Sequence, residues 1–368
     1  MARHWLGRTA GFFAGWLLAA MLPMAVHARP LTIVNFGGAN GQAQAAAFVQ
    51  PFAQARREEV VTAAYNGGLK AIDAMVSRKL ITWDVVDVAP SDLIAGCAAG
   101  LFERIDRRLL PNAAMLLPGA VHECGVGAFV WSTVLVHNAG QFKEPPKNWG
   151  DFWNVAKYPG KRGLRRGARY NLEIALMADG VARSQVYAEL GTEPGVARAL
   201  AKLAQLKPHI VWWDSSEQPL QWLATHEVAM SSVYNGRVHP ANQTRATKVD
   251  IVWTDAIYAL DYWVIVKGSP SRELAHAFMD FAISERAQLA FSREIAYGPT
   301  HMQAIMNYEQ VRPVQQGLPF QAVIDLSMSP SDLPSAPSNL RKSLAFNAAF
   351  WGQKGSDLEG RFERAMGR

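Results

Sequence analysis

The chain has 368 residues, of which 49% are hydrophobic and 18% are charged, a balance typical of a folded globular protein and unlike that of a disordered chain. Its formal net charge is +6, but part of this charge belongs to the N-terminal leader, and the other basic residues are mostly dispersed. A nucleic-acid-binding protein would show a continuous basic stripe or a recognisable module, so the composition argues against nucleic acid as a partner.

Residues 1–28 have the order of a secretory signal peptide. Arg3 and Arg8 precede an uncharged apolar stretch over residues 10–26, and we expect cleavage after the small residue Ala28. The alternative is a retained membrane anchor, but the stretch is shorter than the roughly 20 residues that a spanning helix needs. No cysteine lies near the cleavage point to accept a lipid. We therefore expect the mature chain to be free in the periplasm, without stable membrane insertion.

The mature chain, residues 29–368, has a length that fits two domains better than one. It begins with a β-rich run over residues 31–36, a predicted helix over 43–57 and a predicted buried strand over 83–88. This alternation is typical of an α/β domain. Ser91 and Asp92 follow the second strand, where the carboxyl ends of strands in open α/β sheets collect ligands.

Cys97 and Cys124 are the only cysteines of the chain. In an oxidising compartment an isolated pair predicts a disulfide, and the alternative is two buried free thiols. We do not expect a metal site, because two cysteines alone cannot complete a tetrahedral shell.

Two long apolar runs, residues 128–138 and 258–267, are candidate crossings between two lobes. Two crossings predict a discontinuous first lobe, residues 29–136 plus 264–368, and a continuous second lobe, residues 137–263. The C-terminal part contains predicted helices over 272–286 and 288–294, a Pro/Ser-rich tail over 327–338 and a last amphipathic helix near 356–365.

The sequence lacks the common catalytic motifs. Residues 37–41, Gly-Gly-Ala-Asn-Gly, lack the spacing of a phosphate-binding loop, and the sequence contains no HExxH and no GxSxG. Tyr234 and Tyr258 are isolated, whereas an iron-binding protein of this type would offer adjacent tyrosines. We therefore expect no enzyme activity, no metal and no cofactor.

Several segments in a fixed order resemble one family. These are residues 212–223 (WWDSSEQPLQWL), 227–230 (EVAM), 234–237 (YNGR), 261–263 (DYW), 267–270 (KGSP) and 296–300 (AYGPT). In this order the mature chain resembles the ABC-importer solute-binding proteins of the spermidine/putrescine (polyamine)-binding group, within the extracellular solute-binding protein family. The resemblance implies a type II periplasmic-binding-protein fold with two α/β lobes and a two-crossing hinge. It also implies a monomer that hands a small amine to an inner-membrane permease and its ATPase.

An amine-binding cleft needs carboxylates that pair with ammonium groups and aromatic faces that cover methylenes. The resemblance places Phe36, Ser91, Glu173, Tyr234, Tyr262 and Tyr297 at or near pocket positions, and Asp261 lies one residue from the principal carboxylate of the family. The predicted ligand-binding set is Phe36, Ser91, Asp92, Glu173, Trp213, Tyr234, Asp261, Tyr262, Trp263 and Tyr297. Some of these positions equally suit a structural role: Trp213 and Trp263 are typical of a core, Glu173 of a helix start, and Tyr297 of a turn.

Two departures from the family pattern leave the identity of the ligand undecided. Tyr262 stands at the position of the principal carboxylate, and Tyr170 stands where a second carboxylate is often found. The pocket then suits a smaller or zwitterionic amine such as γ-aminobutyrate (GABA), whose carboxylate would meet nearby arginines. The arginines at 162, 165, 166 and 169 form either this kind of patch or a solvated loop. The sequence is also compatible with a sensory receptor of the same fold, an enzyme on the same scaffold, or a receptor for an anion, a sugar or iron.

Overall fold

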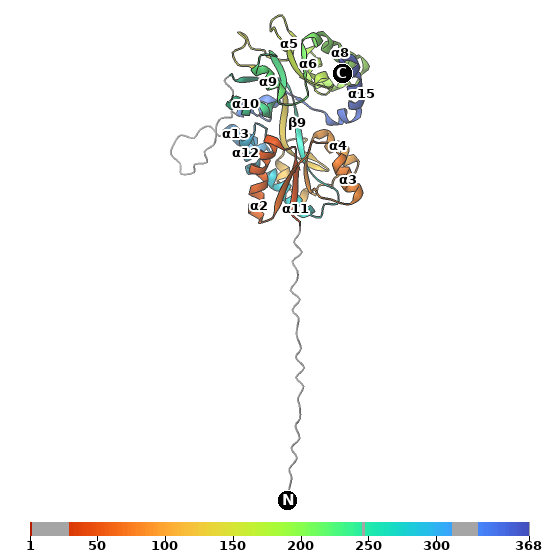
Figure 1. Cartoon of the computed structure of the whole chain (residues 1–368), viewed down its shortest axis with the longest axis vertical. Coiled ribbons are helices and arrows are strands. Elements are labelled where there is room, and N and C mark those ends of the chain that lie inside the picture. Colours follow the sequence, from red (N-terminus) through yellow and green to blue (C-terminus); the bar gives the residue numbers. More distant parts are fainter. Residues whose placement is uncertain (2–28, 245–246, 311–329, 368) are drawn as a thin grey trace, which may run out of the picture.

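The protein has two lobes stacked along its long axis, with β9 running between them (Figure 1). The computed structural model describes Met1 and residues 29–244, 247–310 and 330–367. The predicted signal peptide and the first part of the predicted Pro/Ser-rich tail lie outside these residues. Within the described part of the chain, no helix is both long enough and apolar enough to cross a membrane.

One mixed sheet runs through both lobes. Its strand order is β2-β1-β3-β9-β5-β8-β6-β7, with β4 paired to β5 and β10 paired to β9. The strands are β1 Leu31–Asn35, β2 Val60–Ala64, β3 Val85–Val88, β4 Val121–His122, β5 Gly125–Asn138, β6 Arg162–Arg165, β7 Ile210–Trp213, β8 Met230–Tyr234, β9 Val249–Ile265 and β10 Leu344–Ala345.

The strands β5 and β9 belong to both lobes, and they contain the two segments predicted as crossings. In the first lobe, β5 up to Thr133 pairs antiparallel with β9 from Ile257 onward, while in the second lobe Leu135 pairs with Val252. Four residues of β9 and one residue of β5 are therefore unpaired with each other at this point, and an irregularity of this kind bends a sheet. β9 begins at Val249, earlier than predicted, because its first half is only partly buried and shows no continuous apolar run.

In the first lobe, helices cover both faces of the sheet. One face packs against α1 (Gly38–Gln44), the π-helical turn Ala45–Val49, α2 (Gln50–Arg56), α11 (Arg272–Ala282) and α12 (Glu285–Glu294), which is followed in the chain by α13 (Met302–Gln310). The other face packs against α3 (Lys70–Arg78) and α4 (Pro90–Ala98). The disulfide between Cys97 and Cys124 joins α4 to the residue before β5.

In the second lobe the sheet is again covered on both faces. One face packs against α5 (Trp149–Trp153), α6 (Asn171–Ala178), α7 (Val186–Leu190), α8 (Glu193–Leu206) and α15 (Ala348–Met366). The opposite face packs against α9 (Gln218–Ala224) and α10 (Val238–Thr244), and α14 (Pro337–Leu340) precedes β10.

The C-terminal helix departs from the predicted division into lobes. α15 begins earlier than predicted, and Trp351, Leu358 and Phe362 are buried in the core of the second lobe, not the first. Figure 1 shows α15 and the C-terminus beside α8. α15 therefore belongs to the second lobe, where its apolar stripe packs into the core that also contains α8.

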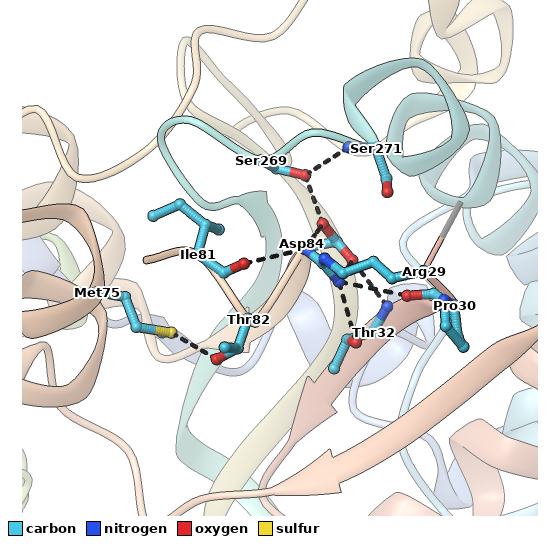
Figure 2. Close-up of polar contacts among 9 residues, drawn as sticks. All are labelled: Arg29, Pro30, Thr32, Met75, Ile81, Thr82, Asp84, Ser269 and Ser271. Carbon is cyan, nitrogen blue, oxygen red and sulfur yellow. Dashed lines mark hydrogen bonds and ion pairs between the residues drawn. The ribbon is translucent and has the colours of Figure 1, made fainter. Parts of the chain in front are cut away.

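A buried ion pair holds the start of β1. The carboxylate of Asp84 is fully buried and accepts two hydrogen bonds of 2.8 Å from the Arg29 guanidinium. It also accepts hydrogen bonds from the Thr32 backbone N–H (2.9 Å) and the Ser269 hydroxyl (2.6 Å), as Figure 2 shows. The ion pair with Asp84 therefore ties Arg29, the residue that follows the predicted cleavage point, to the sheet.

Candidate functional site

Asp261 lies on β9, on the first-lobe side of the irregularity where β9 passes from one lobe to the other. Its side chain is only 7% exposed, and the Trp131 indole Nε1–H donates to its Oδ1 at 2.9 Å. Burial raises the pKa of Asp261 to about 7; the indole N–H opposes this rise, and the nearby Asp92 carboxylate adds to it. An ammonium group placed against Asp261 would favour its charged form.

Aromatic side chains of the second lobe surround Trp131. Its ring meets Tyr170 and Tyr234 edge-on, with centroid distances of 6.0 and 5.4 Å. Tyr170 precedes α6 with a φ of 71°, and Tyr234 ends β8, where its ring also meets Trp213 at 5.6 Å. Ring faces in this arrangement suit methylene groups and a cation.

The second lobe brings positive charge to these rings. Arg165 ends β6, and both Arg165 and Arg169 act electrostatically on Tyr234, which opposes the rise in its pKa caused by burial. The Arg169 guanidinium lies 6.0 Å from the ring centroid of Phe346 and 5.7 Å from that of Trp351. Its Nε, although buried, has no hydrogen-bond partner among the described residues. Tyr234 also lies within electrostatic range of Asp261, so positive and negative groups flank one tyrosine.

The rim of the first lobe is formed by Phe36, Tyr65 and α4. Phe36 stacks on Tyr65 with a centroid distance of 5.2 Å, and the Tyr65 hydroxyl donates to the backbone oxygen of Asp87 at 2.7 Å. Ser91 and Asp92 are half-buried in the first turn of α4, where Asp92 accepts a hydrogen bond from the Gly68 N–H at 3.0 Å.

Two pockets open on either side of this centre. A pocket of about 260 Å³ has Asn40 and Tyr297 from the first lobe and Glu217 and Arg237 from the second in its wall. A second pocket of about 390 Å³ is lined by α4, by Tyr187 and Tyr262, and by residues 345–349. Both pockets have walls from both lobes, so the space between the lobes continues on both sides of β9.

Glu173 lies away from Asp261 in a separate network. It is fully buried in the first turn of α6, where the Trp351 indole N–H (2.5 Å) and the Tyr187 hydroxyl (3.2 Å) both donate to its Oε1. Burial raises the pKa of Glu173 to about 7, although these hydrogen bonds oppose the rise. Glu173 therefore contacts the C-terminal helix, in agreement with a structural role at a helix start.

Four more of the predicted residues are placed by packing. Trp263 is fully buried against Phe48 in the core of the first lobe. Trp213 is 1% exposed and its indole donates to the Ser232 hydroxyl at 3.2 Å. The Tyr262 hydroxyl donates to the Gly119 backbone oxygen at 2.9 Å; its neighbour Asp261 must point to the other face of the strand. The Tyr297 ring stacks on Phe129, with the ring centroids 5.0 Å apart.

Some residues of the site were not among those predicted. Trp131 lies in the first predicted crossing, and Phe346 follows β10; neither has a local sequence signal. Arg165 and Arg169 were predicted only as members of a group of four arginines, and the members of this group have different surroundings in the structure. Arg162 of that group is fully buried and donates to the backbone oxygens of residues 152, 158 and 160, so the solvated-loop interpretation is wrong for it.

Two α/β lobes joined by long strands, with charged and aromatic groups facing each other between them, define a protein that encloses a small solute. The comparisons with known proteins give the same class. The family model for bacterial extracellular solute-binding proteins matches residues 43–306.

Relatives and solved structures cover nearly the whole chain. The gamma-aminobutyric acid-binding protein of Pseudomonas aeruginosa is 42% identical over 336 residues, which cover 91% of this chain and 90% of that protein. An ABC transporter substrate-binding protein from Bradyrhizobium japonicum USDA 110 has a TM-score of 0.80 and 31% identity, with 92% of this chain and 99% of that chain covered. The Atu4243 GABA receptor has a TM-score of 0.78 and 27% identity, with 92% and 98% covered.

The chain belongs to the bacterial extracellular solute-binding protein family. It is an ABC-type solute-binding protein and not an enzyme, as predicted, and the predicted two-lobe fold is confirmed. The narrower polyamine-binding group is not confirmed, since two of these relatives are named for GABA.

Proposed function

We propose that this protein is the periplasmic receptor for a small ω-amino acid of the GABA type, which it delivers to an ABC permease and its ATPase. The observation that carries the proposal is the placement of charge around Tyr234. Asp261 lies on β9, whereas Arg165 ends β6 and Arg169 lies just before α6 in the second lobe, and all three act electrostatically on Tyr234. A zwitterion can pair its ammonium group with Asp261 and its carboxylate with a guanidinium at the same time.

A polyamine fits this arrangement less well. Putrescine carries an ammonium group at each end and needs a carboxylate for each of them. On the second-lobe side the structure offers Tyr170 and two arginines, while Glu173 is engaged by Trp351 and Tyr187. The second ammonium group would therefore meet guanidinium groups, which repel it. The names of the GABA-binding relatives support the same choice.

We further propose that the lobes close on the ligand by bending at β5 and β9. The sheet irregularity between Val252 and Ile257 of β9 supports this position of the bend. The boundary predicted near residue 136 lies beside it, whereas the one predicted near residue 264 lies at the first-lobe end of β9. The signal peptide over residues 1–28 forms part of this proposal, because export places the receptor beside the permease.

The proposal is tested by calorimetric titration of the mature chain with GABA, putrescine, spermidine, butyrate and butylamine. We expect GABA to bind much more tightly than butyrate or butylamine, since each of these carries one of its two charges. In Asp261→Asn we expect affinity for GABA to fall about 100-fold, because a charge-assisted bond at a buried site is lost.

A matched control for this variant is Asp250→Asn, which neutralises an exposed carboxylate near the other end of β9. We expect it to bind GABA like the wild type. Tighter binding of putrescine than of GABA would contradict the zwitterion model. Unchanged affinity in Asp261→Asn would contradict the assignment of the ammonium site.

A further inference from the structure

Asp87 is a second buried carboxyl group beside the proposed ammonium site. It lies near the end of β3 and is fully buried. Its Oδ2 accepts hydrogen bonds from the Gln44 side-chain amide at 2.7 Å and from Asn40 at 3.5 Å. Its Oδ1 has no hydrogen-bond partner among the described residues. An unpartnered oxygen in the interior destabilises the ionised form and needs a proton or a cation.

The sheet register places Asp87 next to Asp261. Asp87 is paired with Trp263 in the antiparallel ladder between β3 and β9. Asp261 lies two residues along β9, and alternate residues of a strand point to the same face. The two carboxyl groups are therefore diagonal neighbours on one face of the sheet, a separation of roughly 7 Å that side chains readily span.

The charged groups that act on this pair are also acidic. Asp261 acts on Asp87, and Asp92 from α4 acts on Asp261. The other titratable groups nearby are the phenols of Tyr65, Tyr234, Tyr262 and Tyr297, and burial raises the pKa of each of them. Among the described residues no arginine or lysine forms an ion pair with Asp87 or Asp261, and the neutral donors are Gln44, Asn40 and Trp131.

Two buried carboxyl groups this close cannot both ionise without a counter-charge. Burial raises the pKa of Asp87 well above its usual value, and the neighbouring Asp261 raises it further. The pKa of Asp261 is itself raised to about 7. Near neutral pH the pair therefore holds at least one proton when no cation is present.

We propose that the pair formed by Asp87 and Asp261 retains a proton in the empty receptor and releases it when the ammonium group of the ligand arrives. The ligand cation then takes over as the counter-charge of the pair, and the O–H bond breaks with the proton passing to solvent. Asp87 acts through Asp261 as a positioning residue, and ligand uptake is linked to pH. This inference rests on the proposed function, because it requires a ligand that carries an ammonium group.

The test is calorimetric titration of the mature wild-type chain with GABA at pH 6.5 in two buffers of different ionisation enthalpy, which counts the protons released. We expect about 0.5 to 1 proton per GABA bound, and affinity about tenfold weaker at pH 5.5 than at pH 7.5. The sign follows from linkage: a proton released on binding makes binding tighter as pH rises. GABA has no group that titrates in this range.

The variant Asp87→Asn keeps the shape of the side chain and removes its proton. We expect it to bind GABA, to release less than half as many protons as the wild type and to show a flatter pH profile. Asp250→Asn is the matched control, with proton release equal to that of the wild type.

Binding of GABA by the wild type without proton release would overturn the model of a retained proton and leave the proposed function intact. This measurement decides the matter even where Asp87→Asn does not fold. Proton release in Asp87→Asn equal to that of the wild type would overturn the role of Asp87. If none of GABA, putrescine, spermidine and butylamine binds, the proposed function fails and this inference fails with it.

Discussion

Replacing Glu173 with glutamine tests whether this residue supports the fold or contacts the ligand. The folded chain raises the pKa of Glu173 from 4.5 to about 7, chiefly by burial. Between these values the folded state holds a proton that the unfolded state has released. Stability is therefore highest below about pH 4.5 and falls as pH rises through about 7. A shift of this size corresponds to about 3 kcal/mol of unfolding free energy lost by pH 8.

Glu173→Gln keeps an oxygen that can accept from Trp351 and Tyr187 but does not titrate. We expect the wild type to lose about 3 kcal/mol more than the variant between pH 5 and pH 8, measured by urea unfolding followed by circular dichroism. Affinity for GABA at pH 7 should stay within about threefold of the wild type, since the residue faces α15 and not Asp261.

The control for this experiment is Glu227→Gln, which removes an exposed glutamate of the same lobe. Its pH profile should follow that of the wild type. An unchanged slope in Glu173→Gln would refute the argument from burial. A large loss of GABA affinity with an unchanged fold would show that Glu173 contributes to ligand binding.

Three other changes test the remaining contacts. Arg29→Ala should lower the unfolding free energy measured in urea by about 2 kcal/mol, because the buried Asp84 keeps only two neutral hydrogen-bond donors. A loss below about 0.5 kcal/mol would contradict this prediction. Joint replacement of Cys97 and Cys124 by alanine should lower the unfolding free energy by about 3 kcal/mol, since the disulfide closes a loop over a sequence separation of 27. Stability equal to that of the wild type would contradict the loop-closure argument. Phe346→Ala should weaken GABA binding about tenfold in calorimetry, while its urea midpoint stays near that of the wild type. Unchanged affinity would show that the Phe346 ring does not contribute to the site.

Local patterns in the sequence were enough to predict the class of the fold and the two strands that link its lobes. Apolar runs at 128–138 and 258–267 indicated β5 and the first-lobe half of β9, because a strand buried on both faces has to be continuously apolar. The partly buried residues through which β9 passes between the lobes gave no such signal. The carboxylate of Asp261 stood out for a related reason, since an acid inside an apolar strand is costly without a partner. Each of these signals is contained in one short stretch of chain.

The side chains that surround Asp261 could not be predicted from local patterns. Trp131, Arg169 and Phe346 come from segments far apart in sequence, and the path of the chain from β10, which pairs with β9, into α15 brings Phe346 to Arg169. The same path turns Glu173 toward Trp351, although its position in the first turn of a helix is equally typical of a ligand contact. Local patterns report the period and burial of one element. The pairing of elements depends on packing between distant parts of the chain, and no single segment encodes it.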